Sequence, residues 1–247
     1  MFKSEPKISQ AIILAAGFGT RMQPLTFKTP KPLVKINNKP ILYYILEELR
    51  KNNIKNCFIN THHLSEKIEK YINEYKYKNQ TMNIIIVNET KILDTGGAIK
   101  NIKNKDTSKP ILVINGDSII IPNHSENFLS QLISNFKPRN MDFLLLLDNK
   151  KKSIGYDGKG DFSFYNINMP SQIYRNNSDS HAFTGWQILN PKIIDKVRLN
   201  KFSLNICYDK AIKNNSIWGM INSGKWLHIG TKNALNRSND WFKETKK

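Results

Sequence analysis

The chain has 247 residues, 39% of them hydrophobic, and a formal net charge of +18 at pH 7. This length and composition are typical of a globular protein with one substantial α/β core. No apolar run approaches the roughly 20 residues that cross a bilayer. The N-terminal residues MFKSEPKISQ lack the apolar stretch of a secretory signal. We therefore expect a cytoplasmic protein with no membrane partner.

The positive charge and the cysteines narrow the class further. The 38 lysines and arginines are scattered along the chain with no run of five or more, which is typical of a solvated surface, so we expect no nucleic-acid partner. A field of this sign would also attract anionic substrates. Cys57 and Cys207 lie far apart in apolar segments, as expected of reduced thiols in a cytoplasm.

Apolar runs and segments with helical spacing alternate over the first 148 residues. Strands are predicted at 11–14, 54–60, 83–88, 110–115 and 141–147. Helices are predicted at 40–51, around 68–75, from the glycine pair at 96–97 to about residue 105, and at 128–136. This alternation predicts an α/β fold: a Rossmann-like, mainly parallel sheet with helices on both faces.

The pattern changes after Asp148. Residues 149–160 are rich in lysine and glycine and predict a surface loop. Strands are then predicted at 161–166, 172–175, 181–190, 217–221 and 226–229, and helices at 193–197, at 202–213 and from Lys232 onward. The sequence has no internal repeat, so we expect a single domain over residues 1–247 without a C-terminal repeat domain.

The segment AIILAAGFGTRMQPLTFKTPKPL at 11–33 carries the strongest functional pattern. A buried strand ends at a turn of small residues, in which Gly17 and Gly19 allow the backbone to approach a ligand closely. Successive backbone N–H groups can then point at a phosphate, while Arg21 and Lys31 supply positive charge. The pattern predicts a site for a polyphosphate.

Two well-known phosphate loops do not fit this segment. It contains no G-x-x-x-x-G-K-[ST], and Met22 stands where the dinucleotide fingerprint has its third glycine. Residues 14–26 and 30–33 instead resemble the signature L-A-A-G-x-G-T-R-M-x-P-L-T followed by P-K-P-L. These motifs mark the sugar-1-phosphate nucleotidyltransferases, which join a sugar 1-phosphate to a nucleoside triphosphate. The resemblance implies the nucleotide-diphospho-sugar transferase type of fold.

The resemblance also implies which residues bind the nucleotide and which are catalytic. Arg21, Lys31 and Asp117 would be catalytic. The expected nucleotide-binding residues are Leu14, Ala15, Ala16, Gly17, Gly19, Thr20, Arg21, Lys31, Gly96, Gly97, Asn115 and Gly116. Residues 1–148 would then form the nucleotide-binding half of the domain, and residues 149–247 a sugar-binding half with a small β-rich part.

A metal site is expected at Asp117, which follows the buried strand 110–115. Open α/β sheets place their chemistry at the carboxyl ends of strands. A carboxylate there suits Mg²⁺, whose other ligands are water and substrate phosphates. Related enzymes commonly have an Asp as second ligand where this chain has His228. An imidazole is a poorer ligand for Mg²⁺, so Mn²⁺ remains possible, and metal ligation, indirect contact and packing all stay open for His228.

Sugar-binding residues are expected in the second half of the chain. Asp161, Thr184 and Gly185 resemble positions that line the sugar pocket in this family. An Asp can accept hydrogen bonds from two sugar hydroxyls, and a Thr-Gly pair can donate from its hydroxyl and backbone. An ordinary turn and a strand bulge are the alternative readings of these residues.

Within the family, the chain most resembles the short enzymes that make UDP-N-acetylmuramate from UTP and N-acetylmuramate 1-phosphate in peptidoglycan recycling. UTP is therefore the favoured nucleotide. Mannose-1-phosphate guanylyltransferase or another hexose-1-phosphate nucleotidyltransferase is the alternative within the family. The alternatives of other classes are a non-catalytic nucleotide-sugar-binding regulator and a basic RNA-associated protein. We expect a monomer or a small homo-oligomer.

Overall fold

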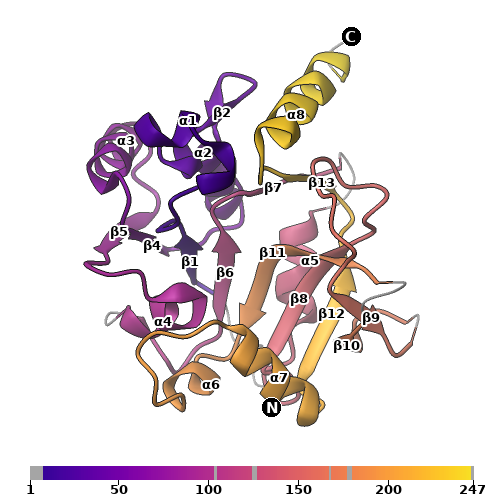
Figure 1. Ribbon diagram of the computed structural model, residues 1–247. Coiled ribbons are helices and arrows are strands. Elements are labelled where there is room, and N and C mark those ends of the chain that lie inside the picture. Colours follow the sequence, from indigo (N-terminus) through magenta and orange to yellow (C-terminus); the bar gives the residue numbers. More distant parts are fainter. Residues whose placement is uncertain (1–7, 103–104, 124–126, 167, 177–179, 246–247) are drawn as a thin grey trace.

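A nine-stranded mixed sheet runs through the centre of the protein (Figure 1). The computed structural model describes residues 8–102, 105–123, 127–166, 168–176 and 180–245. The strand order is β5-β4-β1-β6-β11-β8-β12-β10-β9. These strands are β1 (Gln10–Leu14), β4 (Asn56–Thr61), β5 (Asn83–Asn88), β6 (Ile111–Asn115), β8 (Phe143–Asp148), β9 (Phe162–Phe164), β10 (Ser171–Arg175), β11 (Ala182–Leu189) and β12 (Ile217–Ile221).

Helices cover both faces of this sheet, as the sequence predicts. They are α1 (Leu25–Lys28), α2 (Ile41–Lys51), α3 (Ser65–Lys78), α4 (Asp94–Asn101), α5 (Phe128–Asn135), α6 (Lys192–Asp195), α7 (Asn205–Lys213) and α8 (Lys232–Glu244). Alternate residues of β1 enter two different cores: Ile13 packs in the core that contains α2. Ile12 packs in the core that contains Ile99 of α4 and Cys207 of α7.

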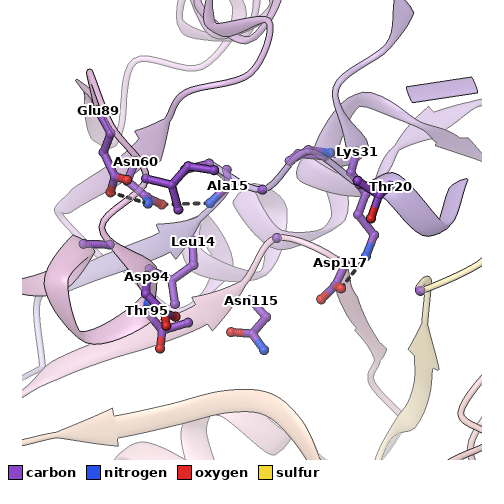
Figure 2. Close-up of a pocket in the computed structure, with 18 of the residues that line it drawn as sticks. Leu14, Ala15, Thr20, Lys31, Asn60, Glu89, Asp94, Thr95, Asn115 and Asp117 are labelled. Carbon is purple, nitrogen blue, oxygen red and sulfur yellow. Dashed lines mark hydrogen bonds and ion pairs between the residues drawn. The ribbon is translucent and has the colours of Figure 1, made fainter. Parts of the chain in front are cut away.

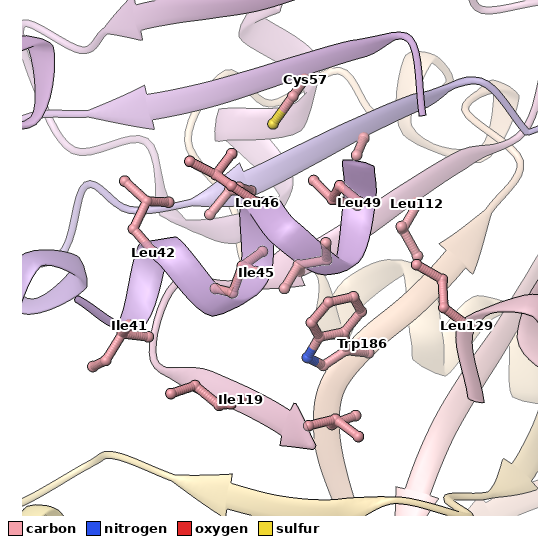
Figure 3. Close-up of a cluster of buried hydrophobic side chains, with 14 of the residues drawn as sticks. Ile41, Leu42, Ile45, Leu46, Leu49, Cys57, Leu112, Ile119, Leu129 and Trp186 are labelled. Atoms are coloured by element: carbon pink, nitrogen blue, oxygen red, sulfur yellow. The ribbon is translucent and has the colours of Figure 1, made fainter. Parts of the chain in front are cut away.

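The core under α2 shows why that helix forms (Figure 3). Its apolar side chains recur at helical spacing and are fully buried: Ile41, Leu42, Ile45, Leu46 and Leu49. Full burial of each such side chain stabilises the fold by about 1.5–3 kcal/mol. Trp186 of β11 packs in the same core. Cys57 and Cys207 are both buried free thiols. Over the described residues, no helix is long and apolar enough to cross a membrane.

The parallel half of the sheet aligns the carboxyl ends of its strands. β1 pairs in parallel with β4 on one side and with β6 on the other. Leu14 at the end of β1 is in register with Asn60 of β4 and with Asn115 of β6. The residues that follow these ends therefore gather at one edge of the sheet, where such folds bind ligands.

The parallel arrangement is interrupted at β11, beyond which β8 and β12 run in the same direction as β6. Strand β11 runs antiparallel to both β6 and β8, and its pairing with β8 shifts between Phe183 and Gln187. Gly185 lies within the shift and has φ +85°, a backbone conformation that favours glycine. The irregularity that the sequence suggests at this Thr-Gly pair is thus a bulge in the strand.

Four local features differ from the sequence-based expectations. An additional strand, β7 (Ser118–Ile121), pairs with β13 (Lys225–His228), and β2 (Lys35–Ile36) pairs with β3 (Lys39–Pro40). The helix expected to end near residue 105 ends at Asn101, and residues 103–104 lie outside the described part. The helix expected from residue 202 begins at Asn205, because the backbone of Phe202 exchanges hydrogen bonds with residues 93–97 instead.

Candidate active site

A cleft of about 380 Å³ opens at the carboxyl ends of β1, β4 and β6 (Figure 2). Most of the residues predicted to bind nucleotide line it together. They are Leu14, Ala15, Ala16, Gly17, Gly19, Thr20, Arg21, Lys31, Asn115 and Gly116, and Asp117, predicted to be catalytic, lines the cleft with them. Residues from six separate segments, including Gly230 after β13, thus meet in one cavity. A cleft with convergent polar and charged groups is the expected form of a ligand site.

Lys31 and Asp117 form an ion pair at the floor of the cleft. Nζ of Lys31 lies 2.5 Å from Oδ2 of Asp117, and their side chains are only 14% and 21% exposed. Burial favours the neutral form of the carboxyl group, but the charge and hydrogen bond of Lys31, together with the charge of Arg21, outweigh this effect. The pKa of Asp117 is therefore held below its ordinary value, and the side chain is an anion at neutral pH.

His228 lies close to this pair, behind Gly230. A Cβ atom on Gly230 would lie 2.6 Å from Nε2 of His228 and 3.5 Å from Nη1 of Arg21. Burial lowers the pKa of His228, Asp117 acts in the opposite direction, and Lys31 and Arg21 reinforce the effect of burial. With its pKa below the ordinary value, the imidazole is neutral at pH 7 and keeps a lone pair.

The turn after β1 is held by contacts between Gly19 and Thr26. Gly19 has φ +64°, and a Cβ atom there would lie 2.9 Å from Cγ2 of Thr26. The hydroxyl of Thr26 donates to the carbonyl of Gly19 at 2.9 Å. Gly17 has no atom within 4 Å of its Cβ position, so the backbone there is open to a ligand. This arrangement supports the predicted close approach of the turn to phosphate.

A buried polar chain behind the turn was not predicted. The N–H of Ala15 donates to Oδ1 of Asn60 at 2.8 Å, and Nδ2 of Asn60 donates to Oε1 of Glu89 at 2.8 Å. Oε2 of Glu89 accepts from the N–H of Leu93 at 3.1 Å. The N–H of Ala15 is therefore committed to Asn60 and fixes the turn. The sequence does contain a signal for this chain of hydrogen bonds: Asn60 is a polar residue at the carboxyl end of β4, and Glu89 directly follows β5.

Gly96 and Gly97, which were predicted to bind the nucleotide, pack against a distant segment of the chain. Neither lines the cleft, and both N–H groups donate to the carbonyl of Phe202, at 3.0 and 3.1 Å. A Cβ atom on Gly96 would lie 2.2 Å from the ring of Phe202, and one on Gly97 would lie 2.4 Å from the carbonyl oxygen of Asn200. The two glycines allow residues 200–202 to pack against α4, while Asp94 and Thr95 line the cleft.

Two of the expected sugar-binding side chains are used within the fold. The hydroxyl of Thr184 is buried and donates to the carbonyl of Leu146 at 2.8 Å. Oδ2 of Asp161 accepts from the N–H of Phe183 at 2.8 Å. Neither residue lines the cleft or the smaller cavity of about 180 Å³ beside it. Asp161 instead positions Phe183, which does line the smaller cavity.

Gly185 contributes through its missing side chain. A Cβ atom on Gly185 would lie 2.9 Å from Nδ2 of Asn115. Asn115 lines both the cleft and the smaller cavity. The glycine thus leaves the space that the Asn115 side chain needs at the junction between the two cavities.

A metal ion would find few protein ligands here. Within the described ranges there is no group of three or more His, Cys, Asp or Glu side chains that could hold a metal. Asp117 offers one carboxylate, and His228 one neutral imidazole beside it. This donor set fits an ion such as Mg²⁺ that takes one or two protein ligands and completes its shell with substrate phosphates and water.

Comparisons of sequence and structure point to the same group of proteins. The profile of the family described as Nucleotidyl transferase matches residues 10–156. N-acetylmuramate alpha-1-phosphate uridylyltransferase of Caulobacter vibrioides is 28% identical over 93% of this chain and 94% of its own length. Mannose-1-phosphate guanylyltransferase catalytic subunit beta of Drosophila melanogaster is 27% identical over 90% of this chain, which spans only 59% of that protein.

Solved structures share the fold. A UDP-glucose pyrophosphorylase complexed with UDP-glucose superposes with a TM-score of 0.77 at 20% identity, over 96% of this chain and 100% of that chain. HddC from Yersinia pseudotuberculosis complexed with GMP-PN gives a TM-score of 0.71 at 22% identity, over 95% of this chain and 100% of that chain. With the matched segment covering more than half of its length, the chain belongs to the nucleotidyl transferase family.

Proposed function

We propose that the protein transfers a nucleotidyl group from a nucleoside triphosphate to a sugar 1-phosphate. An oxygen of the sugar phosphate attacks the α-phosphorus, the bond from that phosphorus to the bridging oxygen breaks, and pyrophosphate leaves with the electron pair. The observation that carries this proposal is the convergence of the glycine turn, Arg21, Lys31 and Asp117 on one cleft.

The residues of the cleft would act by positioning and by neutralising charge. The attacking phosphate oxygen is already anionic near neutral pH, so the reaction needs no general base. The guanidinium of Arg21 would bind the triphosphate with its planar array of donors. Lys31 would neutralise charge on the oxygens of the α-phosphate. Asp117, with or without His228, would hold Mg²⁺, which supplies further neutralisation of the phosphates when bound.

The division of the chain follows from the same assignment. All residues that line the cleft except Gly230 come from residues 14–117. The smaller cavity is lined in part by Phe183, Gln187 and residues of α7, which belong to the second half of the chain. We therefore propose that residues up to about 148 bind the nucleotide and that the remainder supplies most contacts to the sugar.

The first candidate substrates are UTP and N-acetylmuramate 1-phosphate. The support is the match to the Caulobacter enzyme over nearly the full length of both proteins. The second candidates are GTP and mannose 1-phosphate, supported by a similar identity to the Drosophila subunit over about three fifths of its length. The expected place of either reaction is the cytoplasm.

A pyrophosphate-release assay tests the reaction and the substrates together. UTP, GTP, CTP and dTTP are each combined with N-acetylmuramate, mannose, glucose and heptose 1-phosphates, with Mg²⁺ and then with Mn²⁺. We expect release with one dominant pair. Nucleotide binding without release for any pair would instead favour a non-catalytic nucleotide-sugar-binding regulator, and salt-sensitive binding to RNA would favour the RNA-associated alternative.

A further inference from the structure

The smaller cavity adjoins the cleft. The two share four lining residues: Leu14, Asp94, Thr95 and Asn115. Figure 2 shows the side chains of Leu14, Asp94, Thr95 and Asn115 lying near one another on one side of the cleft. The smaller cavity has about 180 Å³, roughly the volume of six waters, so it suits one substituted part of a sugar ring rather than a nucleotide.

The bulge in β11 and the segment before α7 form the walls of this cavity. Phe183 and Gln187 lie on the same face of β11, with Gly185 between them. On the opposite side, the N–H of Leu204 donates to the hydroxyl of Thr95 at 2.8 Å. That bond, together with the two from Gly96 and Gly97 to Phe202, holds residues 202–204 across the outer side of the cavity.

In the side-chain amide of Gln187, Oε1 has a hydrogen-bond partner and Nε2 has none among the described residues. The side chain is only 1% exposed, and its Oε1 accepts from the hydroxyl of Tyr208 at 2.9 Å. The structure gives Nε2 of Gln187 no hydrogen-bond partner among the described residues, although Gln187 lines the cavity. Nε2 is therefore a donor that is open to the cavity, where a ligand oxygen can accept from it.

Tyr208 is itself held rigidly as the donor. Its ring packs edge-on against Phe143 at 5.0 Å and against Phe183 at 6.2 Å between centroids. Burial raises the pKa of Tyr208 well above its ordinary value, so the phenol keeps its proton. Since the phenol donates, Oε1 of Gln187 turns toward Tyr208, and Nε2 is left for the cavity.

The lining also limits the charge that the cavity accepts. Asp94 is the one charged residue among those that line it; the others are apolar or carry uncharged hydroxyl and amide groups. A carboxylate placed there would meet no cation and would face Asp94. An uncharged hydroxyl or acyl oxygen can accept from Nε2 of Gln187 and is not repelled by the charge of Asp94.

We propose that Gln187 is the specificity-determining residue for the acceptor sugar, donating from Nε2 to an uncharged hydroxyl or acyl oxygen on the ring, with Tyr208 as its positioning residue. This assignment rests on the proposed function. It implies that any carboxylate on the acceptor lies outside this cavity. Discrimination comes from the polar pair because a missing partner leaves a buried donor unsatisfied.

The test measures KM for each substrate in three variants. Gln187→Met keeps the length of the side chain and removes the donor, and Gln187→Glu replaces it with an acceptor. We expect KM for the sugar 1-phosphate to rise about tenfold to a hundredfold in both variants, with KM for the nucleotide within twofold of wild type. Tyr208→Phe should give a smaller rise in the same KM. Gln172→Met is the matched control, because Gln172 donates to the carbonyl of Asn215 and lines neither cavity.

Deoxy and deacylated sugar 1-phosphates identify the oxygen that is contacted. Wild type should bind one of these analogues about tenfold or more weakly than the parent sugar. The Gln187→Met variant should bind that analogue and the parent sugar with equal affinity. Calorimetry of each sugar 1-phosphate provides the same comparison without turnover. If wild type turns over but the variants keep the wild-type KM for the sugar, the specificity role is wrong. If wild type binds sugar 1-phosphates but releases no pyrophosphate with any pair, only the proposed reaction is wrong.

Discussion

Replacing Lys31 by Met should slow the reaction while making the nucleotide-free protein a better metal binder. The ammonium of Lys31 is 2.5 Å from Asp117, and both side chains are mostly buried. In the reaction we assign its charge to the α-phosphate, so its loss should remove about 2–4 kcal/mol of transition-state stabilisation, or about 30-fold to 1,000-fold in turnover. In the free protein the same charge competes with a cation for Asp117, so the variant should bind Mn²⁺ more tightly.

The titration of Asp117 provides a second readout of the same variant. Lys31 is the strongest of the charges that hold the pKa of Asp117 below its ordinary value, and burial works against them. Without Lys31, the pKa of Asp117 should rise. The acidic limb of the pH–rate profile, and the pH below which Mn²⁺ binding is lost, should then move to higher pH in the variant.

Steady-state kinetics and Mn²⁺ electron paramagnetic resonance measure these effects. The exposed Lys35 of β2 provides the control variant, Lys35→Met, which should leave turnover and Mn²⁺ affinity unchanged. Circular dichroism verifies that Lys31→Met is folded under the assay conditions. A folded Lys31→Met protein with wild-type turnover would refute the role given to Lys31. Weaker Mn²⁺ binding would refute the competition for Asp117.

Three further predictions concern the surroundings of the cleft. Gly96→Ala should lower the free energy of unfolding by about 1–3 kcal/mol in urea titrations, because the added methyl group meets the ring of Phe202. If stability were unchanged, the packing role of Gly96 would be wrong. His228→Asp adds a carboxylate beside Asp117, which favours Mg²⁺ over Mn²⁺. The ratio of the half-saturating Mg²⁺ concentration to the half-saturating Mn²⁺ concentration should therefore fall about tenfold. An unchanged metal preference would argue that His228 only packs. Asp148→Asn should raise the melting temperature at pH 7, because burial raises the pKa of Asp148 despite the hydrogen bond from Asn222. Because the pKa of Asp148 is raised in the folded state, the stability of the wild-type protein falls as the pH rises through that pKa. The gain in melting temperature from Asp148→Asn should therefore shrink at acid pH. A gain that does not depend on pH would show that burial of the charged carboxylate is not its cause.

The sequence predicts the parallel half of the fold well because its signals are local. Continuous apolar runs mark β1, β4, β5 and β6, and the spacing of apolar residues marks α2. Once those strands are parallel, their carboxyl ends meet at one edge, so the gathering of the glycine turn, Lys31 and Asp117 also follows.

The features that sequence patterns miss depend on contacts between distant segments. β7 forms because residues 225–228 pair with it across more than 100 positions, and no local pattern encodes that partner. The two glycines of α4 look like ligand-binding glycines, and only the packing of Phe202 reveals their use. The donor at Gln187 depends on Tyr208, which is 21 positions away, and on the bulge at Gly185.

The central claim is that Arg21, Lys31 and Asp117 serve one triphosphate and its metal ion. A crystal structure with a non-hydrolysable UTP or GTP analogue and Mn²⁺ tests it most directly. We predict the phosphates against the turn at residues 15–20, within hydrogen-bond distance of Arg21 and Lys31, and the metal on an oxygen of Asp117. A nucleotide bound elsewhere on the protein, or a metal that leaves Asp117 paired with Lys31 as it is now, would contradict the claim.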